Sequence, residues 1–205
     1  MYETFEKLPE RKKEQIIQVC IEEFAQNGYE NTSTNTIVKR LGISKGVLFL
    51  YFKNKKNLYM YIITYLTKLL TDEFFERISR QDKLESLDIF DHLGEFYNIL
   101  IQEKPIILKF MLEAFLNPPV DLSEAIEYEH NYAHMEAMRR INTDKLRDDV
   151  DPQMVIDLLH MVSYHIGQMV YKEYHGQIDN FKDNVYKYTE AYKKYINIIK
   201  YGVYK

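Results

Sequence analysis

Residues 33–52 have the sequence STNTIVKRLGISKGVLFLYF, which predicts two short helices joined by a tight turn. Ser33 can cap a first helix over residues 34–41, because a serine oxygen accepts hydrogen bonds from the unpaired amides of a first helical turn. Gly42 ends that helix, since glycine adopts the left-handed conformation of a C-terminal cap without a steric penalty. Ser44 then caps the second helix. The stretch therefore predicts a helix-turn-helix.

The spacing of apolar residues divides the side chains of this motif between an inner and an outer side. The second helix is predicted over residues 45–51 and is expected to be exposed along one side. The residues with the spacing to pack inward are Ile37, Leu41, Ile43, Leu48 and Phe52. The residues expected on the outside are Thr34, Asn35, Lys45, Val47, Leu50 and Tyr51.

The rest of the chain also has the pattern of helices. Apolar residues recur at three- and four-residue spacing over residues 9–27, where Pro9 and Gly28 suit the two ends of a helix. Seven Gly and five Pro leave too little turn material for a barrel or sandwich of many short strands, so the expected fold class is all-α. Further helices are predicted over residues 55–80, 83–103, 105–116, 121–147, 152–174 and 179–201.

The charge is divided unevenly along the chain. The whole sequence carries −4, but residues 1–58 hold ten Lys and Arg against seven Glu, whereas residues 59–205 hold seventeen against twenty-four Asp and Glu. Because attraction to phosphate acts over about 10 Å in salt, a local positive patch can bind a polyanion on an acidic protein. A solvated helix face is the simpler alternative. No acidic residue lies between Glu30 and Asp72, an interval that contains Lys39, Arg40, Lys45, Lys53, Lys55, Lys56 and Lys68.

Composition and the first residues argue against export and membrane insertion. The longest stretch without an acidic or basic side chain, residues 158–171, has fourteen residues, fewer than the roughly 18 of a membrane span. Residues 1–7 carry acids where a signal peptide would carry bases. The single cysteine, Cys20, cannot form a disulfide within the chain. We therefore expect a cytoplasmic protein without a membrane partner.

The chain resembles the TetR family of bacterial transcriptional regulators over about residues 9–60. The resemblance implies an all-helical dimer whose N-terminal three-helix domain, residues 1–54, contains the helix-turn-helix and binds operator DNA. It also implies a larger helical-bundle domain, residues 55–205, with an effector pocket and the dimer interface. The expected function is that of a ligand-responsive transcriptional repressor. The features that carry the resemblance are Gly28-Tyr29-Glu30-Asn31-Thr32-Ser33, Ile37, Gly42-Ile43-Ser44-Lys45-Gly46 and Tyr51-Phe52-Lys53-Asn54-Lys55.

The same resemblance assigns roles within the helix-turn-helix. Amides at a helix start, hydroxyls and ammonium groups all donate to anions, and a helix of about eight residues fits the major groove. Lys45 has two candidate partners, guanine and phosphate, and the sequence leaves both open. The residues expected to hold backbone phosphates are Ser33, Thr34, Tyr51 and Lys55. The residues expected to approach the base edges are Lys45, Gly46, Val47 and Leu50.

The second helix departs from the family pattern. Val47 stands where the family often has a small hydroxyl residue or Ala, Phe49 where Tyr is frequent, and Leu50 where a polar residue such as His is common. Apolar side chains can contact the methyl group of thymine but cannot form paired hydrogen bonds with a base. We therefore expect an A·T-rich operator that is recognised largely through DNA shape.

The segment after residue 60 is rich in Tyr, Phe and Met, which is typical both of helix cores and of small-molecule pockets. Ordinary packing is therefore the alternative for each candidate pocket residue. The longest uncharged stretch, residues 158–171, is expected to bury a polar group with a partner. The candidate residues for a small apolar or aromatic effector are Phe90, Phe96, Tyr97, Phe110, Met111, Tyr132, Met135, His160, Tyr164 and His165.

The last two predicted helices carry apolar stripes. They either close the core of one chain or meet a second copy, and the resemblance favours an intersubunit four-helix bundle. Such a bundle would hold two DNA-reading helices about 34 Å apart, one turn of the duplex. The stripes consist of Met154, Leu158, Met161, Val162, Ile166 and Met169, and of Tyr188, Tyr192, Tyr195, Ile196 and Ile199.

Two other function classes stay open. Glu127 and His130, like Asp157 and His160, lie one helical turn apart as in di-iron bundles, and His134 adds a second imidazole beside His130. A helical metal enzyme is therefore one alternative. No nucleophile motif, phosphate loop or paired cysteine supports catalysis, so neither enzyme activity, a metal site nor a cofactor is expected. The other alternative is a DNA-bound adaptor that does not change transcription.

Overall fold

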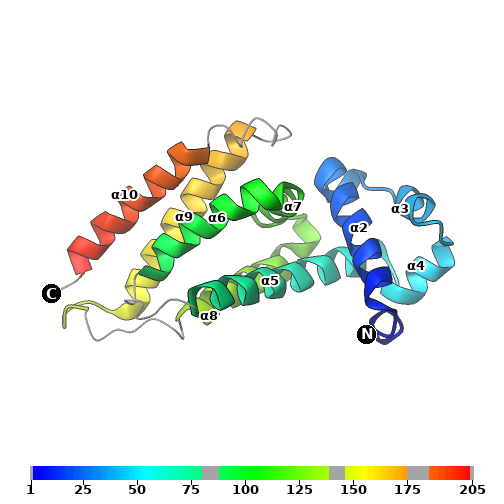
Figure 1. The fold of residues 1–205 in the computed structure, drawn as a ribbon, viewed down its shortest axis with the longest axis horizontal. Helices are drawn as coiled ribbons and strands as arrows, with labels where there is room; N and C mark the ends of the chain where they lie inside the picture. The colour runs from blue at the N-terminus through cyan, green and yellow to red at the C-terminus, as the bar shows by residue number, and fades with distance from the viewer. Residues whose placement is uncertain (1, 80–87, 139–145, 175–184, 204–205) are drawn as a thin grey trace. The chain divides into compact units, whose positions relative to one another are not determined.

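Every element in the described residues, 2–79, 88–138, 146–174 and 185–203 of the computed structural model, is a helix (Figure 1). The all-α prediction is therefore confirmed. Among these residues, none of the helices combines the length and apolar character that crossing a bilayer requires. The elements are α1 Glu3–Glu6, α2 Glu10–Asn31, α3 Thr34–Leu41, α4 Lys45–Phe52, α5 Lys55–Ser79, α6 Asp88–Glu103, α7 Pro105–Leu116, η1 Val120–Leu122, α8 Ser123–Met138, α9 Pro152–Tyr174 and α10 Val185–Val203.

The elements gather into two compact units. The first contains Met1–Thr67 and Ile106–Glu129, and the second contains Lys68–Pro105 and His130–Lys205. Helices α5 and α8 each contribute residues to both units. The division at residues 54 and 55 that the sequence predicts rests on the likeness of the first segment to a DNA-binding domain, and it stays a prediction.

The first unit is built around aromatic and branched side chains. Phe5 is fully buried, and its ring centroid lies 4.7 Å from that of Phe52 and 5.2 Å from that of Tyr61. This cluster explains the four-residue α1, which the sequence analysis missed because a single turn shows no periodicity. Burying one such side chain contributes about 1.5–3 kcal/mol. Further side chains of this unit that are at most 1% exposed include Ile16, Cys20, Ile21, Phe24, Ile37, Leu48, Leu58, Ile62 and Ile63.

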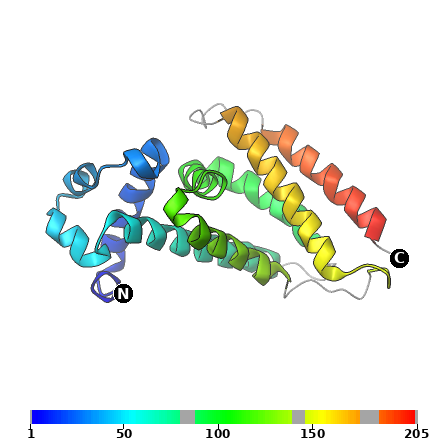
Figure 2. The same cartoon turned by 180° about the vertical axis from the view of Figure 1, so that it is seen from behind.

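In the second unit, α10 packs against both α9 and α6, and the three helices lie side by side in both views (Figures 1 and 2). Gly94 of α6 lets Tyr192 of α10 come close, because a Cβ at position 94 would lie only 3.3 Å from the tyrosine Cδ1. Lys200 of α10 also pairs with Asp91 of α6. The core of this unit includes Phe96, Leu100, Ile101, Val155, Leu159, Ile166, Val170, Tyr188, Tyr192 and Ile196.

Most predicted helix boundaries are confirmed. Helices α3, α4, α5, α7 and α9 begin and end within one residue of the predicted positions. The regular part of α2 ends where predicted, at Gly28 with φ 69°, although a further helical turn follows.

The helix predicted over residues 121–147 is wrong at its end. Helix α8 is described as far as Met138, residues 139–145 lie outside the described residues, and Arg147 is not helical. Its guanidinium instead donates to the Asp149 carboxylate at 3.0 Å and to the Gly202 carbonyl at 2.7 Å, and sequence spacing does not reveal these contacts. The starts predicted at residues 83 and 179 also lie outside the described residues.

Candidate nucleic-acid interface

Helices α3 and α4 are capped as the sequence predicts. The Ser33 Oγ accepts a hydrogen bond from the Asn35 amide at 3.3 Å, and the Ser44 Oγ accepts one from the Val47 amide at 3.2 Å. Between the helices, Gly42 has a left-handed φ of 64° and donates its amide to a carbonyl of α3 at 3.3 Å. Caps of this kind each stabilise a helix by about 1 kcal/mol. Both helices therefore start at a fixed residue, which sets the side chains that each of them presents outward.

Helix α4 buries one side and exposes the other. Leu48 and Phe52 are at most 1% exposed, whereas Leu50 is 64% exposed and Lys45 and Gly46 are also exposed. The inner and outer sides therefore follow the predicted division. The other residues predicted to pack inward are buried at Ile37 and Leu41 and half-buried at Ile43. The other residues predicted on the outside are exposed at Asn35 and half-buried at Thr34, Val47 and Tyr51.

Gly46 lies on the exposed side of α4, in its first turn. A Cβ built there would meet only the Ser44 Oγ, at the ordinary contact distance of 3.8 Å. Its backbone also lacks the positive φ that would require glycine. Glycine destabilises a helix by up to about 1 kcal/mol relative to alanine. Nothing in the described part of the chain therefore requires glycine here, and the residue leaves the backbone of α4 open to close approach from outside.

Only part of the predicted positive patch is available to an external anion. The Lys56 Nζ donates to the main-chain carbonyl of Asp121 at 2.9 Å and lies 3.5 Å from its carboxylate. Acids that neutralise such cations come from outside the acid-free interval, so a charge count along the sequence misses them. The cations with protein partners are Arg40, Lys55 and Lys56. Other cations of the acid-free interval lie in the first unit, are exposed and form no ion pair with any described residue. These are Lys39, Lys45 and Lys53.

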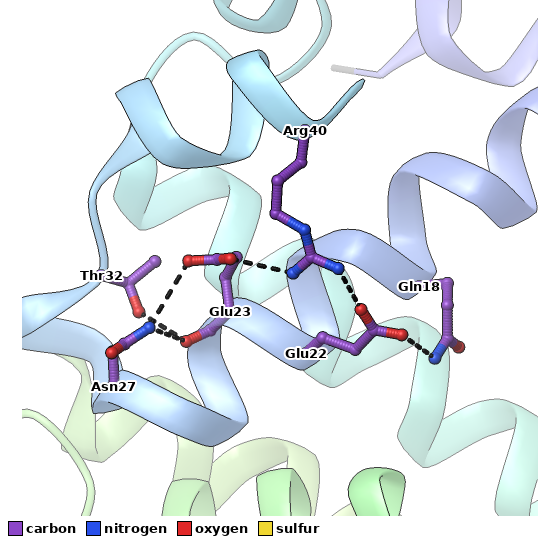
Figure 3. A network of polar contacts seen from close by, with 6 residues as sticks. All are labelled: Gln18, Glu22, Glu23, Asn27, Thr32 and Arg40. Atoms are coloured by element: carbon purple, nitrogen blue, oxygen red, sulfur yellow. Dashed lines mark hydrogen bonds and ion pairs between the residues drawn. The ribbon is translucent and has the colours of Figure 1, made fainter. Parts of the chain in front are cut away.

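Arg40 of α3 forms ion pairs with two carboxylates of α2 (Figure 3). Its guanidinium donates to Glu22 and, at 2.8 Å, to Glu23, which is only 6% exposed. Hydrogen bonds from Gln18 and Arg40 hold the pKa of Glu22 below its usual value. Thr32 completes the network, since its hydroxyl donates to the Glu23 carbonyl at 3.1 Å. Because a buried carboxylate needs such partners, the network fixes how α3 lies on α2.

Lys55, which the sequence analysis assigned to a phosphate, is directed into the protein. Its Nζ donates to the carbonyl oxygens of Tyr29 at 2.7 Å, Glu30 at 3.1 Å and Thr32 at 3.3 Å. It also lies 4.6 Å from the centroid of the Tyr29 ring. The other predicted phosphate contacts are placed on the outer side of the motif: Ser33 is exposed, and Thr34 and Tyr51 are half-buried.

This helix-turn-helix has relatives among known proteins. The sequence profile of the family described as "Bacterial regulatory proteins, tetR family" matches residues 16–62, which contain α3, α4 and most of α2. Over this segment, the chain is similar to the TetR family. The exposed side of α4 is therefore the surface of a TetR-type helix-turn-helix.

Known relatives match the chain either in sequence over part of its length or in fold. The fatty acid metabolism regulator protein of Bacillus subtilis (strain 168) is 36% identical over 69 residues, which is 34% of this chain and 34% of that protein. The chain thus spans about a third (34%) of the length of this relative that it matches.

Two crystal structures share the fold over nearly the full chain. A TetR family transcriptional regulator from Chloroflexus aurantiacus J-10-FL has a TM-score of 0.65 and 22% identity, over 99% of this chain and 98% of that one. The regulator FadR from Bacillus subtilis, in complex with stearoyl-CoA, has a TM-score of 0.63 and 14% identity, over 91% and 96% of the two chains. At these identities the likeness shows a common fold only.

The candidate effector residues divide between the two units. Phe110 and Met111 are buried in the first unit, where the Phe110 ring packs 5.4 Å from that of Tyr59. In the second unit, Phe96 is buried and His160 half-buried. The side chain of Phe90 lies outside the described residues. The exposed candidates are Tyr97, Tyr132, Met135, Tyr164 and His165.

The buried polar group expected in the uncharged stretch is neither Tyr164 nor His165. Both side chains are exposed, because a helix without charges still has two sides and only one of them is covered within this chain. The assignment of these residues to an effector pocket stays a prediction.

The two carboxylate–histidine spacings bring one pair of imidazoles together. The ring centroids of His130 in α8 and His160 in α9 lie 5.1 Å apart, edge to face. Burial lowers the pKa of His130 to about 4, and the neighbouring His160 adds to the effect. Among the residues that the structure describes, no group of three His, Cys, Asp or Glu side chains could hold a metal ion. The side chain of His134 lies outside them.

Helix α9 has two apolar sides, one covered and one open. Val155, Leu159, Ile166 and Val170 are at most 9% exposed. The open side carries Met154 at 66%, Leu158 at 46%, Met161 at 64% and Met169 at 42% exposure. On α10, the exposed apolar residues are Tyr195, Ile198 and Tyr201. The predicted stripes therefore divide: Ile166, Tyr188, Tyr192 and Ile196 close the core, Val162 and Ile199 are half-buried, and the remainder faces outward.

Proposed function

We propose that this chain is a homodimeric TetR-family transcriptional repressor that binds operator DNA through α4 and is released by a small effector. The observation that carries the proposal is the outer side of α4, where Lys45, Gly46 and Leu50 are exposed on a capped helix of eight residues. A helix of this length fits the major groove. Lys39 and Lys53 beside it supply exposed positive charge for the backbone of the duplex.

The contacts follow from this placement. We assign Lys45, Gly46, Val47 and Leu50 to base edges, and the phosphates to Ser33, Thr34 and Tyr51. Lys55 is left out of the phosphate set because its ammonium already has three carbonyl acceptors. Since Val47 and Leu50 offer only apolar surface, the operator is A·T-rich at the groove contacts and is recognised partly by shape.

The open side of α9 supports the homodimer. Four large apolar side chains, Met154, Leu158, Met161 and Met169, lie along it, and α10 adds Ile198 at 69% exposure. A second copy that covers this side removes it from water and satisfies two-fold symmetry, because the same surface then serves both partners. In such a dimer the two α4 helices read successive major grooves, about 34 Å apart.

The effector is a small apolar or aromatic molecule bound by the helical body. Helix α5 supports the coupling, since it begins beside the helix-turn-helix and contributes residues to both units. A coupling free energy of about 1–3 kcal/mol between effector and operator binding lowers operator affinity about 5- to 150-fold. The similar FadR structure contains stearoyl-CoA, so a long-chain acyl thioester is the first effector to test. Such a regulator acts in the cytoplasm, where its operator lies.

Selection of duplexes from a randomised pool, followed by footprinting at low ionic strength, tests the DNA-binding part of the proposal. We expect palindromic, A·T-rich sites with half-sites about one helical turn apart. A protein that selects no duplex refutes the proposal, and sites rich in G·C at the groove contacts refute the assignment of Val47 and Leu50. Deleting the gene and measuring neighbouring transcripts separates a repressor from an adaptor, because an adaptor occupies the site without changing transcription.

A further inference from the structure

We infer that Lys55 is a positioning residue for DNA binding: it fixes the phosphate-facing start of α3 and does not itself contact the duplex. The inference rests on the proposed function and deepens it. It concerns the first turn of α5 and the turn between α2 and α3, all of which belong to the first compact unit.

The turn between α2 and α3 leaves carbonyl groups without partners from the helices themselves. Gly28, with φ 69°, interrupts α2, and Thr32 is extended with ψ 123°. The last carbonyls of a helix have no intrahelical donor. Lys55 supplies that donor to Tyr29, Glu30 and Thr32 at 2.7–3.3 Å.

The Lys55 ammonium has no N–H donor left for a phosphate. A lysine carries three N–H donors and no acceptor, and each of these donors has a carbonyl within hydrogen-bond distance. Its side chain is also half-buried and lies against the Tyr29 ring. The backbone from which it starts is fixed, because the Asn54 Oδ1 caps α5 by accepting the Asn57 amide at 2.8 Å.

The contact between Lys55 and Thr32 lies one peptide bond away from the candidate interface. Thr32, held by Lys55 at its carbonyl, directly precedes Ser33, the cap of α3 and a proposed phosphate contact. The Thr32 hydroxyl is held separately, by the carbonyls of Gly28 at 2.6 Å and Glu23 at 3.1 Å. Lys55 therefore sets the position of the first α3 amides, which would face the duplex.

The test compares Lys55→Met with two matched lysine variants on the duplex that the unmodified protein selects. Lys39→Met removes an exposed charge, and we expect the slope of log affinity against log salt to fall by about 0.9 per half-site. Lys55→Met should lower affinity about 10-fold at every salt concentration, because charged hydrogen bonds are lost, with the slope unchanged. Lys56→Met, whose ammonium binds Asp121, should change neither quantity.

Hydrogen exchange without DNA provides a second readout that does not depend on the proposed function. We expect Lys55→Met to speed exchange of the amides at residues 29–36 about 10-fold, Lys55→Arg to restore protection, and Lys56→Met to leave those amides unchanged. A Lys55→Met protein that loses salt slope as Lys39→Met does, with unchanged exchange, overturns the inference. If no duplex is selected, the proposed function fails, and the exchange result still decides the role of Lys55.

Discussion

Replacing Gly46 by alanine should strengthen folding and weaken DNA binding at the same time. The added Cβ meets only the Ser44 Oγ, at 3.8 Å, so the protein accommodates it without rearrangement. Alanine is favoured over glycine in a helix by up to about 1 kcal/mol. For a chain of this size, that gain raises Tm by roughly 2–4 °C.

The effect on DNA has the opposite sign because the methyl group projects from the exposed side of α4. In the proposed complex it occupies the space between the helix backbone and the base edges. Losing one close contact with a base costs about 1–3 kcal/mol, which weakens each half-site roughly 5- to 150-fold. Fluorescence anisotropy on the selected duplex measures the affinity, and circular dichroism measures Tm.

Gly94→Ala provides the matched control. Its Cβ would lie 3.3 Å from the Cδ1 of the buried Tyr192, so the crowding opposes the gain in helix propensity and this substitution should raise Tm less than Gly46→Ala does. Its position in α6 is away from the helix-turn-helix sequence, so the folded variant should bind the duplex normally. A Gly46→Ala protein with unchanged operator affinity would show that the backbone of α4 does not approach the bases, and the reasoning on this residue would be refuted.

Other substitutions test the dimer, the ion-pair network and the histidine pair. Met161→Glu should give a monomer in sedimentation velocity with at least 100-fold weaker operator binding, because two-fold symmetry places each introduced charge in the apolar interface twice; a stable dimer would contradict the α9 interface. Arg40→Ala should lower the free energy of unfolding in urea by about 2 kcal/mol, since the buried Glu23 loses a charged hydrogen bond, whereas Arg40→Lys should lose less. His130 has a folded pKa of about 4, below its unfolded value of about 6.5, so the unfolded chain binds the proton first and stability is lost as pH falls through this window. Between pH 7 and pH 5 the wild type should lose about 2 kcal/mol more than His130→Gln in urea titrations, and equal losses would contradict the assignment.

The helix-turn-helix could be predicted in detail because its determinants are local. Ser33, Gly42 and Ser44 act within four residues of their own positions, so their sequence context contains the whole cap. The buried side of α4 followed for the same reason, since helix periodicity alone places Leu48 and Phe52 together.

The roles of the cations could not be predicted, because they depend on contacts between distant residues. Arg40 meets acids 17 and 18 residues away, and Lys56 meets a residue 65 positions away. Lys55 is the sharpest case: its partners are main-chain carbonyls, which every residue carries, so no side-chain pattern could reveal them.

The sequence also could not show which apolar residues of α9 are covered. Both sides of α9 carry large apolar residues, and only the structure distinguishes Ile166, which closes the core, from Met161, which faces outward. The assignment of the exposed candidates Tyr164 and His165 rested on the absence of charge, and absence of charge does not fix which side of a helix is covered.

Leu50 gives the protein an unusual thermodynamic signature. At 64% exposure, this leucine keeps a shell of water on the outer side of α4, which in the proposed complex faces the duplex. Pressing it against thymine methyl groups releases that water, so association should show a markedly negative heat-capacity change. The affinity of the proposed repressor for its operator would then respond to temperature as well as to the proposed effector.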